Sequence, residues 1–221
     1  MVARLDQKLV DIVALSLGVS LSSVALSCAF ALPLGAALAV ADFPGRATIV
    51  TTLNALLGLP AVVVGLAVYL LLSRAGPLGG LGILFTSKAM VIAQAILIFP
   101  LLAALTRQVV ADAWLESREQ LVSLGAGTWT SAVALLVDLR FSLVTVVLAG
   151  FGRAISEVGA VMIVGGNIDG VTRVMTTAIA LETSKGDLPL ALGLGIVLLA
   201  IVLALNAVAS SVKTAALRRH G

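Results

Sequence analysis

Long apolar runs without a charged residue are the main pattern of the chain. Residues 12–41, 47–73 and 188–212 contain no Asp, Glu, Lys or Arg, and residues 89–106 form a shorter run of the same kind. A helix of about 20 apolar residues crosses a bilayer and satisfies its own backbone polar groups there. A chain of 221 residues is too small to bury four such helices in a soluble core. The pattern therefore predicts membrane-spanning helices.

A fifth apolar stretch, residues 131–166, contains four charged side chains: Asp138, Arg140, Arg153 and Glu157. Ionisable groups at membrane depth are costly and usually face the inside of a helix bundle or a water-filled path. We place a fifth span at about residues 141–164. The sequence thus predicts an all-α, polytopic membrane helical bundle of about five transmembrane helices, built as a single domain over residues 1–221.

The composition supports this interpretation and excludes one class of function. Hydrophobic residues make up 60% of the chain and charged residues 11%, whereas soluble proteins average nearer half and a quarter. The net charge of +3 is spread out without a basic cluster, so we predict no nucleic-acid binding. The first apolar stretch is too long for a signal-peptide core and has no convincing cleavage site. We therefore expect it to stay in the mature protein.

Residues that carry catalysis or bind metals are scarce. Cys28 is the only cysteine and His220 the only histidine. A single cysteine excludes an internal disulfide. One cysteine and one histidine also leave no basis for a metal site built from Cys and His, or for a pair of histidines in acid–base catalysis. The glycines at 79–82 lack the Lys and the Ser or Thr of a phosphate-binding loop. We predict no enzyme activity, no metal and no cofactor in this chain.

The distribution of Lys and Arg predicts the orientation. The C-terminal tail carries Lys213, Arg218 and Arg219 without an acidic residue, which places it in the cytoplasm by the positive-inside rule. Five spans then put the N-terminus outside, although two cations near the N-terminus run against that assignment. The segment between residues 107 and 140 would face the cytoplasm.

The segment between residues 114 and 131 starts with charged residues and does not suit a span. Residues 116–124 can form a short amphipathic helix. Gly125 and Gly127 would end this helix and allow a sharp turn, because glycine tolerates left-handed backbone angles. The sequence thus predicts a compact knob within a cytoplasmic loop at about residues 108–138.

Glu119-Gln120-Leu121, followed after three residues by Gly125, resembles the ATPase-coupling loop of permeases from binding-protein-dependent ABC importers. That loop carries Glu-Ala-Ala, three further residues and Gly, so the Glu and the Gly match while Gln and Leu replace the alanines. The family's later Leu-Pro pair is absent. The resemblance assigns ATPase coupling to six residues: Glu119, Gln120, Leu121, Gly125, Ala126 and Gly127.

Other segments extend the resemblance over nearly the whole chain. LPAVVVGL (59–66) and RAGPLG (74–79) are similar to the second span and outer loop of molybdate- and tungstate-type permeases. RAISEVGA (153–160), running into GGNI (165–168), is similar to the segment after the coupling loop in oxyanion importers. MTTAIALETSKGD (175–187) is most similar to the tungstate branch.

The resemblance implies a function and partners. The chain would form the translocation path of an oxyanion importer in the cell inner membrane, as a homodimer, with tungstate favoured over molybdate or a mixed preference. ATP and Mg²⁺ would be bound by a separate ATPase, one copy for each permease, and an external or periplasmic binding protein would deliver the anion. A secondary transporter or channel, the main alternative, would need its own coupling-ion site. An intramembrane enzyme would need a catalytic pair.

Arg153 and Glu157 lie four residues apart, so on one helix they would share a face and could pair. Two hypotheses stay open. The pair either only allows two charges to sit in the membrane, or it lies beside the translocation path, where Arg153 helps the path to tolerate an anion. Gly165-Gly166-Asn167 predicts a turn into the external loop, and the resemblance implies a gate or a contact with the binding protein at this turn. The candidate path or gate residues are Arg153, Ser156, Glu157, Gly165, Gly166 and Asn167.

Overall fold

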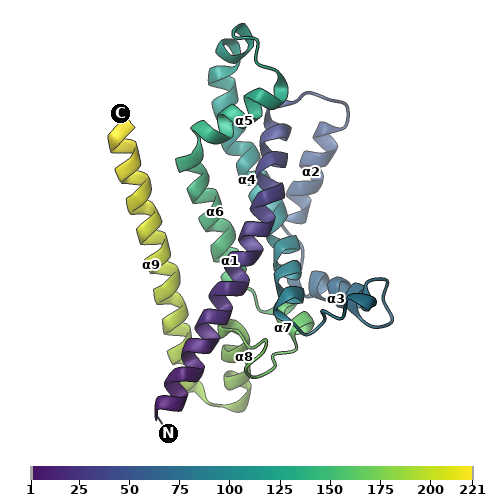
Figure 1. The fold of residues 1–221 in the computed structure, drawn as a ribbon, viewed down its shortest axis with the longest axis vertical. Helices are drawn as coiled ribbons and strands as arrows, with labels where there is room; N and C mark the ends of the chain where they lie inside the picture. The colour runs from purple at the N-terminus through teal and green to yellow at the C-terminus, as the bar shows by residue number, and fades with distance from the viewer. Residues whose placement is uncertain (1, 221) are drawn as a thin grey trace. The chain divides into compact units, whose positions relative to one another are not determined.

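The computed structural model describes the backbone of residues 2–220 and, among them, the side chains of residues 7–208, 210 and 211. These residues form nine α-helices, one 3₁₀ helix and no strand (Figure 1), which confirms the all-α prediction. In chain order the helices are α1 (Val2–Val40), α2 (Arg46–Leu56), α3 (Ala61–Leu72), the 3₁₀ helix η1 (Gly79–Leu81), α4 (Ser87–Ser123), α5 (Thr128–Asp138), α6 (Arg140–Ile155), α7 (Gly159–Gly165), α8 (Met175–Lys185) and α9 (Leu188–His220).

Three of the described helices are long and apolar enough to cross a membrane: Gln7–Val40 of α1, the whole of α4, and Leu188–Val208 of α9. Two interrupted pairs, α2 with α3 and α5 with α6, raise the number to five if each pair is one span. The predicted number of about five agrees with this upper value. The orientation stays a prediction, because the side chains of the three tail cations on which it rests lie outside the described residues.

The predicted span at residues 47–73 is not one continuous helix, and the prediction is wrong in that respect. α2 ends at Leu56 and α3 begins at Ala61. The interruption contains Gly58 and Pro60, and Pro60 has an extended backbone with a ψ of 124°. Proline disfavours the helical conformation at the residue before it, which explains why the helix stops here.

The predicted span at residues 141–164 is also divided. α6 ends at Ile155 and α7 begins at Gly159, so residues 156–158 are not helical. At the other end, helical structure begins earlier than predicted, because α5 starts at Thr128 and joins α6 through a bend of 80°. The sequence located the apolar stretch correctly but not the breaks within it.

The chain divides into two compact units, and its description as a single domain stays a prediction. The first unit comprises Met1–Val24, Leu59–Leu97 and Phe151–Leu205, and the second comprises Ala25–Gly58, Ile98–Gly150 and Asn206–Gly221. Four helices, α1, α4, α6 and α9, contribute residues to both units.

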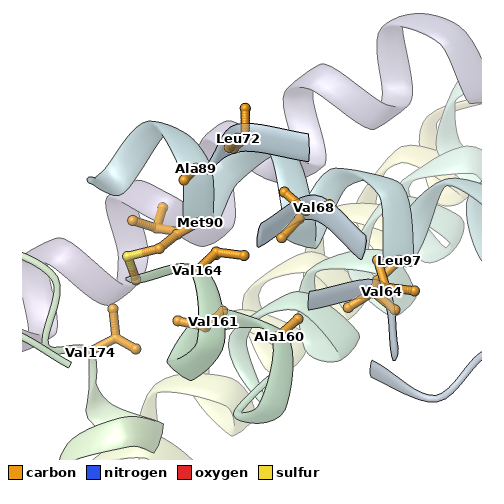
Figure 2. Close-up of a cluster of buried hydrophobic side chains, with 12 residues drawn as sticks. Val64, Val68, Leu72, Ala89, Met90, Leu97, Ala160, Val161, Val164 and Val174 are labelled. Carbon is orange, nitrogen blue, oxygen red and sulfur yellow. The ribbon is translucent and has the colours of Figure 1, made fainter. Parts of the chain in front are cut away.

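In the first unit, α7 packs against α3 (Figure 1). Figure 2 shows the buried cluster around this contact, which includes Val64, Val68, Met90, Val161 and Val164. A Cβ atom added at Gly65 would lie 2.7 Å from the Cα of Ala160. The two helices therefore approach each other closely only because position 65 is glycine, as is common where helices associate within lipid.

The second unit has its own core, built from α1, α4 and α5, and its fully or nearly buried members are Ala36, Ala39, Val40, Val110, Ala132 and Leu135. Glycine again permits close contacts. A Cβ at Gly35 would lie 2.7 Å from the carbonyl oxygen of Ala103, and one at Gly150 would lie 2.7 Å from Leu102 Cδ2.

Many large apolar side chains point outward. Along α9, the outward residues Leu192, Ile196, Leu199 and Leu203 are 63% to 67% exposed. An apolar surface of this length would be a site of association in water, but it suits contact with lipid chains. The exposed face of α9 therefore supports its assignment as a membrane span.

Candidate functional site

The predicted short helix at residues 116–124 is not a separate element. These residues are the C-terminal end of the 37-residue helix α4, which corrects the prediction. No Gly or Pro interrupts the chain between residues 101 and 124, so the helix continues without a break. The α4–α5 turn (residues 119–127) therefore sits at the end of a long helix.

The α4–α5 turn closes with the backbone pattern that glycine permits. The N–H of Ala126 donates to the carbonyl oxygen of Leu121 (3.0 Å), and the N–H of Gly125 donates to that of Val122 (2.9 Å). These two bonds satisfy carbonyls that the end of a helix otherwise leaves free. Gly125 has a φ of +73°, which confirms its predicted left-handed conformation. Gly127 has a φ of −74°, so the left-handed conformation predicted for it is wrong.

Side chains of the α4–α5 turn divide into an anchor and an exposed surface. Leu121 is partly buried and packs against the core of the second unit. Glu119 and Gln120 are exposed. Beside them, Leu124 is 81% exposed and Trp129 is 64% exposed. Exposed apolar side chains next to polar ones are typical of protein interaction surfaces.

The second group of predicted residues, Arg153, Ser156 and Glu157, forms an elbow between α6 and α7 in the first unit. Arg153 Nη1 lies 2.6 Å from Glu157 Oε2. The prediction that these two residues pair is confirmed, but the helix ends between them, so they do not share a helical face. Ser156 is exposed, and its hydroxyl donates to the carbonyl oxygen of Arg153 (3.1 Å).

Glu157 is the buried partner of this pair, with 4% exposure. Its Oε1 accepts a hydrogen bond from the backbone N–H of Ala160 (3.1 Å), in the first turn of α7. A carboxylate at a helix N-terminus satisfies a free N–H and interacts favourably with the helix dipole. Both carboxylate oxygens of Glu157 therefore have partners, as burial of a charge requires.

Arg153 is the accessible partner, and its side chain is 41% exposed. A guanidinium group has five N–H donors, and Glu157 takes only one of its edges. The elbow thus presents a cation that is half-exposed and partly neutralised by a fixed carboxylate. Such a group attracts an anion weakly, whereas a cluster of free cations would hold it.

Gly165, Gly166 and Asn167 form the turn at the C-terminal end of α7. Gly166 has a φ of +72°, and its N–H donates to the carbonyl oxygen of Met162 (2.9 Å). Asn167 has a φ of +50°, and its side-chain amide donates to the carbonyl oxygen of Thr177 (3.4 Å). The predicted turn is confirmed, whereas the gate stays a prediction. α7 separates this turn from the elbow along the chain.

The segment after α7 carries a group of charges. Asp169 accepts from Lys8 Nζ (3.3 Å) and from Arg173 Nη1 (2.9 Å). The hydrogen bond from Lys8, followed by the charge of Arg173, lowers the pKa of the Asp169 carboxyl below its ordinary value. All three side chains belong to the first unit and tie its N-terminal helix to the segment after α7.

One residue beside the elbow went unnoticed in the sequence. Gln94 of α4 is 3% exposed, and its side-chain amide donates to the carbonyl oxygen of Ala154, next to Arg153 (2.9 Å). The available signal was a lone glutamine inside the apolar run at residues 89–106. Within the described part of the chain, no cluster of three His, Cys, Asp or Glu residues could hold a metal ion.

Comparison with known proteins supplies the family. No protein-family model matches the chain. It is 42% identical over 220 residues to the probable anion ABC transporter permease protein of Haloferax volcanii, covering 96% of this chain and 94% of that protein. It is 43% identical over 208 residues to the tungstate uptake system permease protein TupB of Peptoclostridium acidaminophilum, covering 94% of this chain and 91% of TupB. The chain is an anion ABC transporter permease.

This family membership confirms the resemblance drawn from the sequence. The similarity to the molybdenum transport system permease protein ModB of Escherichia coli K12 is lower, at 31% identity over 186 residues, with 79% of the permease and 81% of ModB covered. The permease is therefore a multi-pass membrane protein of the oxyanion transport type. Its membership of an ABC transporter family argues against a secondary transporter, a channel or an intramembrane enzyme.

Proposed function

We propose that this permease forms the translocation path of an ATP-driven importer for a tetrahedral oxyanion, with tungstate as its preferred substrate. The observation that carries the proposal is the 43% identity to a tungstate uptake permease over 94% of the chain. The lower identity to a molybdenum permease favours tungstate over molybdate. A permease for molybdate, or for both anions, is the alternative.

In the proposed assembly, two copies of the permease enclose the path, since closed two-fold pairs are the commonest assemblies. ATP and Mg²⁺ bind to a separate ATPase subunit, one for each permease, in the cytoplasm. An external binding protein delivers the anion. The C-terminus lies in the cytoplasm and the N-terminus outside.

The α4–α5 turn is the proposed contact with the ATPase, through Glu119, Gln120, Leu121, Gly125, Ala126 and Gly127. Three features support this role: the turn ends a long helix, its backbone is fixed by hydrogen bonds, and it exposes Leu124 and Trp129. A helix that continues from the ATPase contact into the membrane can transmit the movement of the ATPase, which alternates between two discrete states.

The elbow is the proposed contact with the path, through Arg153, Ser156 and Glu157. The half-exposed guanidinium attracts the anion, and the buried carboxylate limits that attraction so that the anion can leave. The turn at Gly165, Gly166 and Asn167 is proposed as a gate beyond α7. Its two left-handed residues and its close contact with Met90 support a defined hinge point.

The substrate is tested by uptake of radiolabelled tungstate into proteoliposomes that hold the permease, its ATPase and its binding protein. ATP-dependent uptake that resists excess molybdate and sulfate is the expected result. Equal competition by molybdate would replace tungstate with a mixed preference. Uptake without ATP would contradict the importer assignment, and an ATPase variant unable to hydrolyse ATP provides the control.

A further inference from the structure

A chain of buried hydrogen bonds reaches the elbow from two other helices of the first unit. Ser23 of α1 is fully buried, and its single hydroxyl proton is shared between the carbonyl oxygen of Val19 (2.7 Å) and Gln94 Oε1 (2.9 Å). From the other end of the same amide, Gln94 Nε2 donates to the carbonyl oxygen of Ala154 (2.9 Å). One glutamine side chain therefore connects α1, α4 and the last turn of α6.

Ala154 is a position where such a bond has a local effect. It lies one residue before the end of α6, where carbonyl oxygens have lost their helical partners. The same carbonyl accepts the backbone N–H of Glu157 (3.1 Å), which starts the elbow. Gln94 thus holds the backbone unit that directly follows Arg153 and that sets the beginning of the turn to Glu157.

The far side of the elbow is held in the same way. The hydroxyl of Thr176 in α8 donates to the backbone carbonyl oxygen of Glu157 (2.7 Å). Next to it, the backbone N–H of Met175 donates to the hydroxyl of Ser16 in α1 (2.8 Å). These bonds lead from the elbow through α8 back to α1, where the bond to Gln94 began.

Together with the backbone of α1 between its two serines, the contacts close a ring of buried residues, which we call the polar ring: Ser16, Ser23, Gln94, Ala154, Glu157, Met175 and Thr176. Every member of the ring is buried, with 7% exposure or less. Polar side chains inside a membrane bundle are costly unless they are paired, and an apolar residue at position 94 would fill the same space. Packing alone does not require this glutamine.

We propose that Gln94 is a positioning residue for transport, which fixes the direction of the Arg153 guanidinium by holding the carbonyl of Ala154. The inference rests on the proposed function, because it assumes that Arg153 faces the transported anion. Gln94 does not touch the anion itself. Its loss would let the backbone at the end of α6 rotate, and the guanidinium would then sample directions in which the anion meets it less often.

The first test measures the elbow without any transport. A spin label is attached at Ser156→Cys in a Cys28→Ala background, in the complete importer. Gln94→Met removes both hydrogen bonds at similar volume and is expected to increase the motion of the label. Ser23→Ala removes the bond between α1 and Gln94, together with the bond of the same hydroxyl to Val19 within α1, and leaves the bond from Gln94 to Ala154 in place. It should give a smaller increase. Ser20→Ala is the matched control, because Ser20 is equally buried in α1 and makes no described hydrogen bond to the ring.

The second test measures anions imported per ATP hydrolysed, for each assembled complex. A structural defect would lower import and hydrolysis together and leave their ratio unchanged. Misdirection of Arg153 should lower the ratio, by about three- to tenfold in Gln94→Met, the range of one interhelical hydrogen bond in a membrane. Ser23→Ala should lower it less, and Ser20→Ala should leave it unchanged. Ser23→Ala keeps the test decisive if Gln94→Met does not assemble.

The outcomes separate the two proposals. An unchanged label in both Gln94→Met and Ser23→Ala would overturn the positioning role. A more mobile label with an unchanged ratio would show that Gln94 only stabilises the fold, and would also overturn it. Normal uptake by Arg153→Ala would remove Arg153 from the path and with it the effect of Gln94 on transport. In that case the label would still report whether the polar ring holds the elbow.

Discussion

The α4–α5 turn and the elbow are two helix ends that solve the same problem in different ways. In the turn, Gly125 lets the backbone fold back, and backbone N–H groups satisfy the free carbonyls. In the elbow, the free groups are satisfied by side chains, including a buried carboxylate and a buried amide. An exposed end can also use water, whereas a buried end in an apolar core must find every partner within the protein.

This difference predicts how each region tolerates substitution. The exposed turn depends on the conformation of one backbone position. A substitution there should weaken binding of the proposed ATPase partner before it unfolds the permease. The elbow depends on the buried carboxylate of Glu157 and its partners, and it should lose its fold first.

The largest effect is expected from Glu157→Ala. The substitution leaves the N–H of Ala160 without a partner and Arg153 without its counter-charge. Breaking a fully buried ion pair costs about 3–5 kcal/mol. Since Arg153 is 41% exposed, we expect about 2–3 kcal/mol here. Thermal unfolding of the purified complex and its yield from membranes measure the loss.

Glu157→Gln is the matched control for this substitution. It keeps an acceptor for Ala160 but removes the charge, so it should cost less than Glu157→Ala. Equal stability of the wild-type and Glu157→Ala proteins would show that the elbow does not depend on its carboxylate, and the contrast between the two helix ends would fail.

Gly125→Ala is expected to have a smaller effect on stability but a clear effect on the binding of the ATPase to the permease. A side chain at a φ of +73° costs about 1–2 kcal/mol, because Cβ approaches the backbone carbonyl. We expect the turn to change shape and the proposed ATPase contact to weaken, while most of the permease remains folded. Co-purification of the ATPase and ATP-dependent uptake are the measurements.

Gly127→Ala supplies the comparison for Gly125→Ala. Its φ of −74° is available to alanine, and a Cβ there would meet no atom within 4 Å. ATPase binding close to that of the wild type is expected. If both substitutions reduced binding equally, the left-handed conformation of Gly125 would not be the reason that glycine is needed in this turn.

The exposed surface of the turn should respond differently from its backbone. Leu124→Ser removes an 81% exposed apolar side chain, so it should change the stability of the permease by less than about 0.5 kcal/mol. If Leu124 contacts the ATPase, the same substitution should weaken co-purification several-fold. Unchanged binding in Leu124→Ser and in Trp129→Ala would place the ATPase contact elsewhere.

The α4–α5 turn and the elbow also differ in how much of each could be predicted from the sequence. Glu119, Gly125 and the apolar runs located the turn, because glycine conformation and hydropathy are local properties. The pairing of Arg153 with Glu157 followed from their spacing. The break at residues 156–158 did not, because its partners Gln94 and Thr176 lie 60 and 19 residues away from the groups that they bind. A continuous apolar helix and a broken one have the same composition, and only such distant contacts distinguish them.

Other errors had signals within the sequence. Pro60 marks the end of a helix at the residue before it, yet residues 47–73 read as one apolar run. The uninterrupted residues 101–124 favoured a single long helix over a separate short one. The position of the α4–α5 turn was therefore predicted correctly, whereas the length of the helix before it was predicted to be too short.

The smallest effect is expected at Asp169, which is exposed and held by Lys8 and Arg173. Because its pKa is lowered in the folded protein, its ion pairs stabilise the fold fully above the ordinary carboxyl pKa of 3.8. That contribution disappears as the pH falls through the lowered pKa. The difference in unfolding temperature between the wild type and Asp169→Asn should therefore be small, constant from pH 7 to 5, and should shrink as the pH falls below 3.8. If Asp169→Asn destabilised the permease as much as Glu157→Ala, burial would not be what separates costly from tolerant ion pairs in this protein.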